Sequence, residues 1–529
     1  MTNFAAPPLS RDQIVLFPER LDQIIPEDHC VRMIDDILGR LDWAKWEQLY
    51  NGRIGQPPIH PRVIASVILY GILCRIRSSR SLEEALAVRN DFRWLVEGRT
   101  IDHTTISEFR RKNADQLKDL FVQIVLVARD LGHVPLATLG FDGTRMRANN
   151  RKTGTRTPEE LRKAKAELEA KFRELEAKTA AADQQDDERL GDDSDHKLSE
   201  ELADVDRRRK QVDAALAEIE RLTGEGEKVP ARIPVTDPQS RVTPNKEGGF
   251  APNYTPHATV DVDSGMVVSA DVISNTDEDK HMFAAVQDVK ESFGLVEVPG
   301  ELLADGMMST GDNLAKCEQA CIDLYSPIKL GGGPDNPAVR EDPRVPVAQA
   351  DIERLPMTTT KKKDGTKSAK FNKNAFVYDA EADCYCCPAG KPLAYANKTS
   401  QVENGRKRIR YRYKADVADC AGCPLAERCL SGKTKSRQIS HEQHEAKRIA
   451  HAEKMSSDEA KQKYSRRRHP GERPFAMIKG HFGARRFLTR GRERVRNEWL
   501  WLTSAFNLHR LLRLIASDPD PPASQAPAS

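Results

Sequence analysis

The sequence predicts an α/β protein in which a mixed sheet follows an all-α N-terminal domain. Residues 1–135 carry the apolar spacing and the capping signals of helices. From residue 136 onward, short apolar runs alternate with helical segments, which is the pattern of a mixed α/β sheet. A chain of 529 residues is long enough for about two to four domains with large cores.

Composition narrows the class of protein. Hydrophobic residues make up 39% of the chain and charged residues 31%, which fits a soluble protein with long exposed helices. The N-terminus has no apolar signal core, and the longest apolar run, 63–74, is too short to span a bilayer. We therefore expect a cytoplasmic protein that has no membrane partner and whose cysteines are reduced or metal-bound.

The N-terminal domain is predicted to consist of short helices. A proline begins the apolar segment 63–73, which suits a buried helix. Capping boxes of the form Ser/Thr-x-x-Glu predict further helices near 82–91 and 105–131. A basic cluster on the last helix would contact DNA as part of a helix-turn-helix, or would be the solvated rim of an ordinary bundle. The cluster consists of Arg110, Arg111 and Lys112.

The first strand of the sheet and a long insertion come next. Residues 136–142 form a short apolar run that ends in an acid, as a buried strand does. Apolar residues at heptad spacing then recur on both sides of the polar stretch 180–197. This pattern predicts an antiparallel coiled-coil hairpin over 157–224, which would be either a pairing arm or an inserted spacer.

The sheet resumes after the insertion. Segments 258–262 and 266–273 flank a glycine turn and predict a β-hairpin. The elements that follow are a helix over 277–292, a strand ending at Asp305, a helix over 311–323 and a strand over 326–330. Residues 333–375 have the composition of a loop.

These segments define the predicted organisation. They are a helical DNA-binding domain (1–135), the first part of the core (136–156), the coiled-coil hairpin (157–224), the continued core (225–332), a loop and Cys-rich insertion (333–440), basic helices that complete the core (441–515) and a disordered tail (516–529).

The C-terminal basic segment has the strongest charge pattern in the chain. Residues 461–513 contain 15 Lys or Arg against three Glu, whereas the whole chain has a net charge of +3. Such an excess is typical of a surface that binds polyphosphate, and we expect Arg485 and Arg486 to contact phosphate. Glu472 is an isolated acid in this segment, so a metal ion or an arginine must offset its charge.

Two aspartates end strand-like runs. Asp142 and Asp305 each follow an apolar run and precede a glycine, although an Asp-Gly pair is also an ordinary turn signal. Together with Glu472, they would supply the oxygen ligands of two divalent cations, which lie about 3.5–4 Å apart in two-metal phosphoryl chemistry. Carboxylate oxygen favours Mg²⁺ or Mn²⁺.

Cysteines cluster between residues 384 and 429. They would supply the thiolates of a tetrahedral structural Zn²⁺ site, or they would be free thiols. Three of the candidate ligands are Cys420, Cys423 and Cys429. The fourth is Cys387 or Cys384, because the spacing allows either.

Several segments resemble the DDE transposases of bacterial insertion sequences, in the branch whose founding element is numbered eleven-eighty-two. The N-terminal segments are FPERLDQIIPEDHCVRMIDDIL, GQPPIHPRVIASVILYGIL, SSRSLEEA and DHTTISEFRR. LGFDGTRMRAN, ELLADGMMSTGDN and RRRHPGERPFAMIKGHFG resemble the segments that carry the family's three catalytic acids, which map to Asp142, Asp305 and Glu472. The resemblance covers most of the chain outside the coiled-coil insertion and the tail.

The resemblance implies a ribonuclease H-like core that cleaves the element end and transfers the freed 3′-hydroxyl to target DNA. It implies Arg468 and Lys479 as phosphate contacts on either side of Glu472, and Cys387 as the fourth zinc ligand. The implied partners are double-stranded DNA, namely terminal inverted repeats and target DNA, in the bacterial nucleoid. Because two ends must be brought together, we expect a homodimer or a larger assembly.

The chain departs from the family pattern at three places. Ala476 stands where the family usually has glycine, Gly306-Met-Met replaces Gly-Tyr, and Asn253-Tyr-Thr replaces Gly-Tyr-Asn. None of these changes removes a predicted metal ligand. They leave open altered DNA contacts or reduced activity. The alternatives to a transposase are an inactive or domesticated DNA-binding regulator and a ribonuclease H-like nuclease that cleaves without joining.

Overall fold

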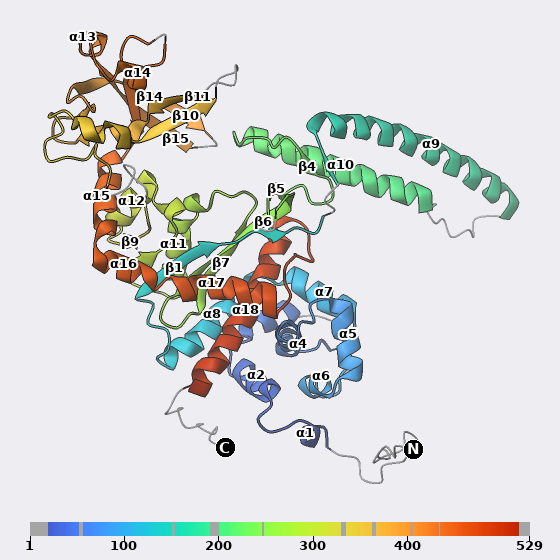
Figure 1. Ribbon diagram of the computed structural model, residues 1–529. Helices are drawn as coiled ribbons and strands as arrows, with labels where there is room; N and C mark the ends of the chain where they lie inside the picture. The colour runs from blue at the N-terminus through green and yellow to red at the C-terminus, as the bar shows by residue number, and fades with distance from the viewer. Residues whose placement is uncertain are drawn as a thin grey trace, which may run out of the picture. The chain divides into compact units, whose positions relative to one another are not determined.

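The computed structural model describes residues 20–51, 57–150, 154–190, 200–245, 248–328, 335–361, 367–403, 406–432 and 434–517 (Figure 1). The chain forms two compact units. The helical unit consists of 1–131, 477–484 and 497–529. The sheet unit consists of 132–476 and 485–496. None of the helices in the described ranges is long and apolar enough to cross a membrane.

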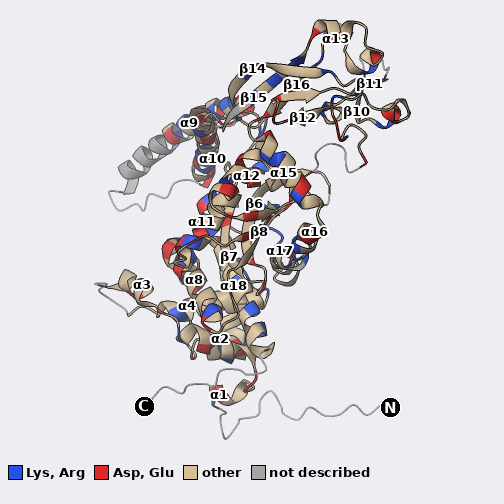
Figure 2. Ribbon diagram, turned by 90° about the vertical axis from the view of Figure 1, so that its left-hand side faces the viewer, with Lys and Arg blue, Asp and Glu red and all other residues tan. Residues whose placement is uncertain are grey.

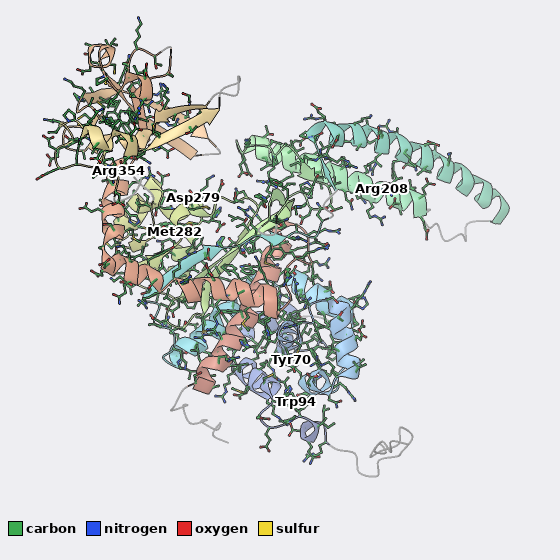
Figure 3. The ribbon with its side chains drawn as sticks, viewed as in Figure 1. Tyr70, Trp94, Arg208, Asp279, Met282 and Arg354 are labelled. Carbon is green, nitrogen blue, oxygen red and sulfur yellow. The ribbon has the colours of Figure 1, made fainter. Side chains whose placement is uncertain are left out.

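The N-terminal part of the helical unit is all-α, as predicted. Its elements are α1 (Leu21–Ile24), α2 (Cys30–Gly39), α3 (Ala44–Glu47), the 3₁₀ turn η1 (Gln48–Tyr50), α4 (Pro61–Leu73), α5 (Ser79–Val88), α6 (Asn90–Leu95), α7 (His103–Lys112) and α8 (Ala114–Asp130). Helix α4 is buried along almost its whole length, as its apolar sequence predicts. Tyr70 on α4 donates its hydroxyl to Asp91 at 2.7 Å (Figure 3).

The predicted starts of two helices are wrong by a few residues. Ser78 accepts a hydrogen bond from the N–H of Ser81 and caps α5, and Asp102 accepts one from the N–H of Thr105 and caps α7. The capping residues therefore precede those that the Ser/Thr-x-x-Glu pattern indicates. The helix predicted over 105–131 is two helices, because Asn113 leaves the helical conformation between α7 and α8.

The C-terminal helix α18 (Arg492–Ser517) contributes its larger part to the helical unit. Glu498 accepts a hydrogen bond from Arg77 at 2.6 Å in an ion pair whose side chains are only 12% and 13% exposed. Trp501 packs near Phe109, with ring centroids 6.3 Å apart. The sequence assigned all of 441–515 to the core, whereas residues 497–517 belong with the N-terminal helices.

A mixed sheet forms the centre of the sheet unit. Strand β1 (Thr138–Gly143) pairs antiparallel with β6 (Phe250–Asp261) and parallel with β8 (Glu301–Leu303). Strand β7 (Val267–Ile273) pairs antiparallel with β6, and β9 (Asp323–Tyr325) pairs parallel with β8. Short strands β2 (Met146–Arg147) and β5 (Arg241–Pro244) extend the N-terminal half of β6. The predicted hairpin and mixed α/β sheet are confirmed.

Helices cover this sheet. Helix α11 (Met282–Ser292) packs against β7 and β6, and α12 (Gly311–Gln319) follows β8. The strand predicted over 326–330 is wrong, since β9 ends at Tyr325 and residues 329 and 330 lie outside the described residues. Pro327 has no N–H for a strand ladder, which explains why the strand ends before it.

The insertion after β1 is a helical hairpin, as predicted. Helices α9 (Pro158–Leu190) and α10 (Glu200–Gly224) pack against each other, and their contact buries Leu161, Val212 and Ile219 (Figure 1). Helix α9 continues to residue 190, although the sequence predicted a loop from residue 180. The segment 191–199 lies outside the described residues.

The Cys-rich insertion contains a second, antiparallel sheet. Its strands, in spatial order, are β12 (Val377–Asp379), β13 (Cys384–Cys386), β14 (Pro392–Glu403), β15 (Arg406–Ala415) and β16 (Gln438–Glu442). A further hairpin, β10 (Met357–Lys361) and β11 (Lys367–Phe371), lies where a loop was predicted. Figure 2 shows basic residues along β14 and β15. Helices α13 (Val417–Ala421) and α14 (Ala426–Cys429) precede β16, and α15 (Glu445–Ser456), α16 (Asp458–Ser465) and α17 (Arg468–Ala476) follow it.

Candidate functional site

The two predicted aspartates lie at the same edge of the central sheet. Strands β1 and β8 are parallel neighbours, with Gly140 opposite Leu303. Asp142 is the penultimate residue of β1, and Asp305 follows the end of β8 by two residues. Because the carboxyl ends of neighbouring parallel strands meet at one edge of a sheet, the fold brings both side chains to the same region.

The loop that carries Asp305 is closely packed. Asp305 Oδ1 accepts a hydrogen bond from the backbone N–H of Met307 at 2.8 Å, which caps the 3₁₀ turn η3 (Gly306–Met308). A Cβ atom on Gly306 would lie 2.7 Å from the carbonyl oxygen of Pro327. The glycine after Asp305 is therefore required for close packing, in addition to any role in a turn.

Helix α17 carries the third predicted acid. The helix packs against β1 and β6 with Gly471, Pro474 and Phe475 buried. Glu472 is exposed on this helix. The negative charge of Glu472 contributes to raising the pKa of the Asp142 carboxyl, so it acts at the edge of the sheet where β1 ends.

The charges of the other two predicted acids act on Asp142. Burial raises the pKa of Asp142 above its ordinary value, and the charges of Asp305 and Glu472 raise it further. The Arg467 guanidinium acts in the opposite direction, with its Nη2 atom 3.0 Å from Asp142 Oδ1. The backbone N–H of Gly143, which donates to the same carboxylate at 2.9 Å, also lowers this pKa. Asp142 is therefore within electrostatic reach of both Asp305 and Glu472.

The arginine beside Asp142 is Arg467, the neighbour of the Arg468 that the resemblance implies as a phosphate contact. Arg468 is exposed at the first position of α17, and Arg466 forms an ion pair with Asp263 at 2.6 Å. Two of the three consecutive arginines precede the helix and the third begins it, and their sequence does not indicate which side chain faces Asp142.

A fourth acid lies at this edge of the sheet, and the sequence analysis missed it. Glu278 begins the 3₁₀ turn η2 (Glu278–Lys280), which lies between β7 and α11. Burial and the charges of Asp142 and Asp305 raise its pKa to about 7, while Arg145 and Arg467 lower it. Glu278 follows a hairpin rather than a parallel strand, so the strand-end rule does not find it.

The chemistry of this donor set fits hard divalent cations. Four carboxylates and two arginines, Arg145 and Arg467, interact here, so negative charge is in excess. Carboxylate oxygen is the ligand that Mg²⁺ and Mn²⁺ prefer. Among the described side chains, no group of three His, Cys, Asp or Glu is already arranged to hold a metal ion.

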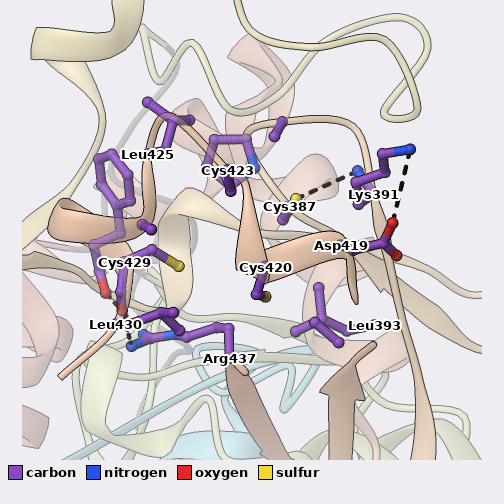
Figure 4. Close-up of a pocket in the computed structure, with 15 residues that line it drawn as sticks. Cys387, Lys391, Leu393, Asp419, Cys420, Cys423, Leu425, Cys429, Leu430 and Arg437 are labelled. Atoms are coloured by element: carbon purple, nitrogen blue, oxygen red, sulfur yellow. Dashed lines mark hydrogen bonds and ion pairs between the residues drawn. The ribbon is translucent and has the colours of Figure 1, made fainter. Parts of the chain in front are cut away.

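The clustered cysteines line a small cavity of about 30 Å³ (Figure 4). The cysteines that line it are Cys387, Cys420, Cys423 and Cys429. Cys384 is buried on β13 and does not line the cavity, so the geometry favours Cys387 of the two alternative ligands. Burial raises the pKa of Cys387, and the neighbouring thiols of Cys423 and Cys420 raise it further. Within the described ranges these sulfurs are neighbours without forming a metal-ligand group.

One predicted phosphate contact has a structural role. Arg110 is partly buried. Its Nη1 donates a hydrogen bond to the carbonyl oxygen of Arg77 at 2.7 Å. Burial lowers its pKa to about 10. Arg110 therefore packs within the helical unit, while the neighbouring Arg111 is exposed and pairs with Glu108 at 3.7 Å.

The remaining predicted contacts are in the basic C-terminal segment. Arg485 and Arg486 are exposed in the sheet unit, and Arg486 donates a hydrogen bond to the side chain of Asn149. Lys479 lies in a π-helical turn (Met477–His481) of the helical unit and is partly exposed. Exposed arginines on a folded element are suited to contacts with a phosphate backbone.

Comparison with known protein families gives two matches. Residues 386–512 match a family described as a transposase DDE domain. Residues 19–112 match a family described as a transposase domain. No curated protein matches the chain. The first match includes Glu472 and the four cysteines of the cavity, whereas Asp142 and Asp305 lie before it.

Proposed function

We propose that this chain, a transposase by both of its family matches, cuts DNA at the ends of an insertion sequence and joins the freed 3′ ends to target DNA. The observation that carries the proposal is the position of Asp142 and Asp305 at the ends of adjacent parallel strands, with the charge of Glu472 also acting on Asp142. Two of these acids lie outside the matched segments, so their assignment depends on the fold.

The order of the central sheet supports a ribonuclease H-like core. Its five main strands lie in the order β7-β6-β1-β8-β9, with β1, β8 and β9 parallel and β6 antiparallel to its neighbours. The resemblance implies a core in which two neighbouring parallel strands bring two catalytic aspartates together. Here β1 and β8 fill that role.

Asp142, Asp305 and Glu472 would hold the divalent cations of the reaction. Bound Mg²⁺ or Mn²⁺ would supply charge stabilisation at the reacting phosphate and lower the pKa of an attacking water. Arg467 favours the ionised form of Asp142, because its charge opposes the rise in pKa that burial causes, and the N–H of Met307 donates a hydrogen bond to the carboxylate of Asp305. These contacts orient the acids before DNA binds, which reduces the reorganisation needed for reaction.

DNA binding is proposed for the basic surfaces of both units. Arg485 and Arg111 are exposed, and Arg410 and Lys414 are exposed on β15. Two ends must be held together for strand transfer, so the proposal includes a homodimer or a larger assembly.

A strand-transfer assay separates this function from its alternatives. Labelled DNA ends that carry the terminal inverted repeats are incubated with the protein, target DNA and Mg²⁺. Cleavage with joining is expected. Cleavage without joining would instead support the nuclease, and tight binding without cleavage would support the regulator.

The cysteine cavity is proposed to hold a structural zinc ion. Its four thiols are partly buried neighbours, and thiolates are soft ligands suited to Zn²⁺. Purified protein is expected to contain about one zinc ion per chain, and Cys423→Ser should remove it. Cys384→Ser should retain it, because Cys384 does not line the cavity. Zinc-free wild-type protein with the same unfolding temperature would contradict the assignment.

A further inference from the structure

Glu278 lies directly against the end of β1. A Cβ atom on Gly143 would be 2.0 Å from Glu278 Oε2 and 2.6 Å from its Cδ atom. Gly143 is the residue after Asp142, so the Glu278 carboxylate occupies the space that any side chain at position 143 would fill. The glycine that an Asp-Gly turn signal explains from the sequence has a second role, which is to admit this carboxylate.

The carboxylate of Glu278 has no hydrogen-bond or ion-pair partner among the described residues. The nearby cations are engaged elsewhere. Lys280 bonds to Asp277 at 2.7 Å, Arg467 bonds to Asp142 at 3.0 Å, and Arg145 donates to the carbonyl oxygen of Pro244 at 2.7 Å. Burial of a carboxylate without a hydrogen-bond or ion-pair partner costs free energy, so we expect the half-buried Glu278 to have a partner.

The backbone holds Glu278 beside the loop that carries Asp305. The buried amide of Asn313 donates to the carbonyl oxygen of Asp279 at 2.8 Å and to that of Met308 at 3.1 Å. One side chain thereby ties η2 to η3. Figure 3 labels Asp279, which follows Glu278 in η2, and Met282, which begins α11. The position of Glu278 is therefore fixed by the same packing that fixes Asp305.

We propose that Glu278 is a fourth carboxylate ligand, direct or through a bound water, of the divalent cations that Asp142, Asp305 and Glu472 hold. The inference rests on the proposed function and adds a residue to that same site. A cation would give the unpartnered carboxylate its partner and would offset the excess of negative charge that the two arginines leave. A purely structural carboxylate would instead be paired by one of the neighbouring cations.

The test is Mn²⁺ binding by the full chain, measured by calorimetry, together with DNA cleavage. Glu278→Gln preserves the shape of the side chain and removes its charge, so we expect Mn²⁺ affinity to fall by at least about 10-fold. Gly143→Ala should weaken Mn²⁺ binding as well, because the added methyl group displaces the carboxylate. Glu297→Gln, an exposed acid of the same unit, is the matched control and should bind Mn²⁺ like the wild type.

Comparison with Asp142→Asn tests the role of Glu278 separately from the three-acid metal site. If Asp142→Asn loses Mn²⁺ while Glu278→Gln binds it with wild-type affinity, the role of Glu278 is wrong and the three-acid site stands. If neither variant changes Mn²⁺ affinity, both the site and this addition to it are wrong. Circular dichroism and unfolding temperature in metal-free buffer establish that each variant is folded.

Discussion

At the scale of single residues, the site depends on which of its four acids the two neighbouring arginines contact. Arg467 is the only one of three consecutive arginines that bonds to Asp142 in the described structure. Glu278 is next to Gly143, more than a hundred residues away in the chain. Sequence spacing indicated the two strand-end aspartates because strands end where apolar runs end. It could not indicate Glu278 or choose Arg467, because both depend on contacts that form only in the folded chain.

Arg467→Gln should shift the pH dependence of cleavage. Arg467 lowers the pKa of Asp142, so its removal raises that pKa, and the acid remains protonated to higher pH. The acidic limb of the pH–rate profile should therefore move to higher pH, with a loss of maximal rate. Lys461→Gln, an exposed cation on the preceding helix α16, should leave the profile in place. An unchanged acidic limb in Arg467→Gln would show that Asp142 does not need this partner.

His257 should make the sheet unit sensitive to acid. Burial lowers the pKa of His257 to about 4, against an ordinary value near 6.5. Between these values the unfolded chain takes up a proton that the folded chain does not, so stability falls as pH decreases from about 6.5 to about 4, by about 3 kcal/mol at most. Urea unfolding of wild type and His257→Gln at several pH values measures this loss. The variant should lose less stability over the same interval, and equal losses would contradict the account.

At the scale of elements, periodicity and turn signals predicted the type of most helices and strands but not their ends. The hairpin β6–β7, the buried helix α4 and the helical hairpin α9–α10 are confirmed. The strands of the second sheet, β12–β16, were not predicted, since β15 has a clear alternation, of Tyr with Arg or Lys over 410–414, while the other four strands do not show it. Two helix caps were misplaced, since Ser78 and Asp102 compete with equally suitable residues nearby.

The turn after β8 offers a test of how tightly the Asp305 loop is packed. Gly306→Ala would place a methyl group 2.7 Å from the carbonyl oxygen of Pro327, so we expect a loss of about 1–3 kcal/mol of stability and slower cleavage. Gly300→Ala, just before β8, is the control because open space surrounds that position. Thermal unfolding of both variants gives the comparison. A Gly306→Ala protein as stable and as active as the control would mean that the loop is free to adjust.

At the scale of the whole molecule, the chain combines two units whose sequences interleave. The helical unit takes its last helix from the C-terminal end of the chain, and the sheet unit receives both long insertions. The sequence predicted the all-α and α/β parts and the insertions. The division of 441–515 between units was not predictable from it, because the apolar face of α18 is consistent with packing against either a sheet or a bundle.

The central claim is that Asp142, Asp305 and Glu472 hold divalent cations. The most direct measurement is anomalous scattering from crystals of the protein grown or soaked with Mn²⁺. We expect manganese peaks at the ends of β1 and β8, bounded by these three acids, and their loss in Asp142→Asn. Manganese bound only elsewhere, or peaks that persist unchanged in Asp142→Asn, would contradict the account.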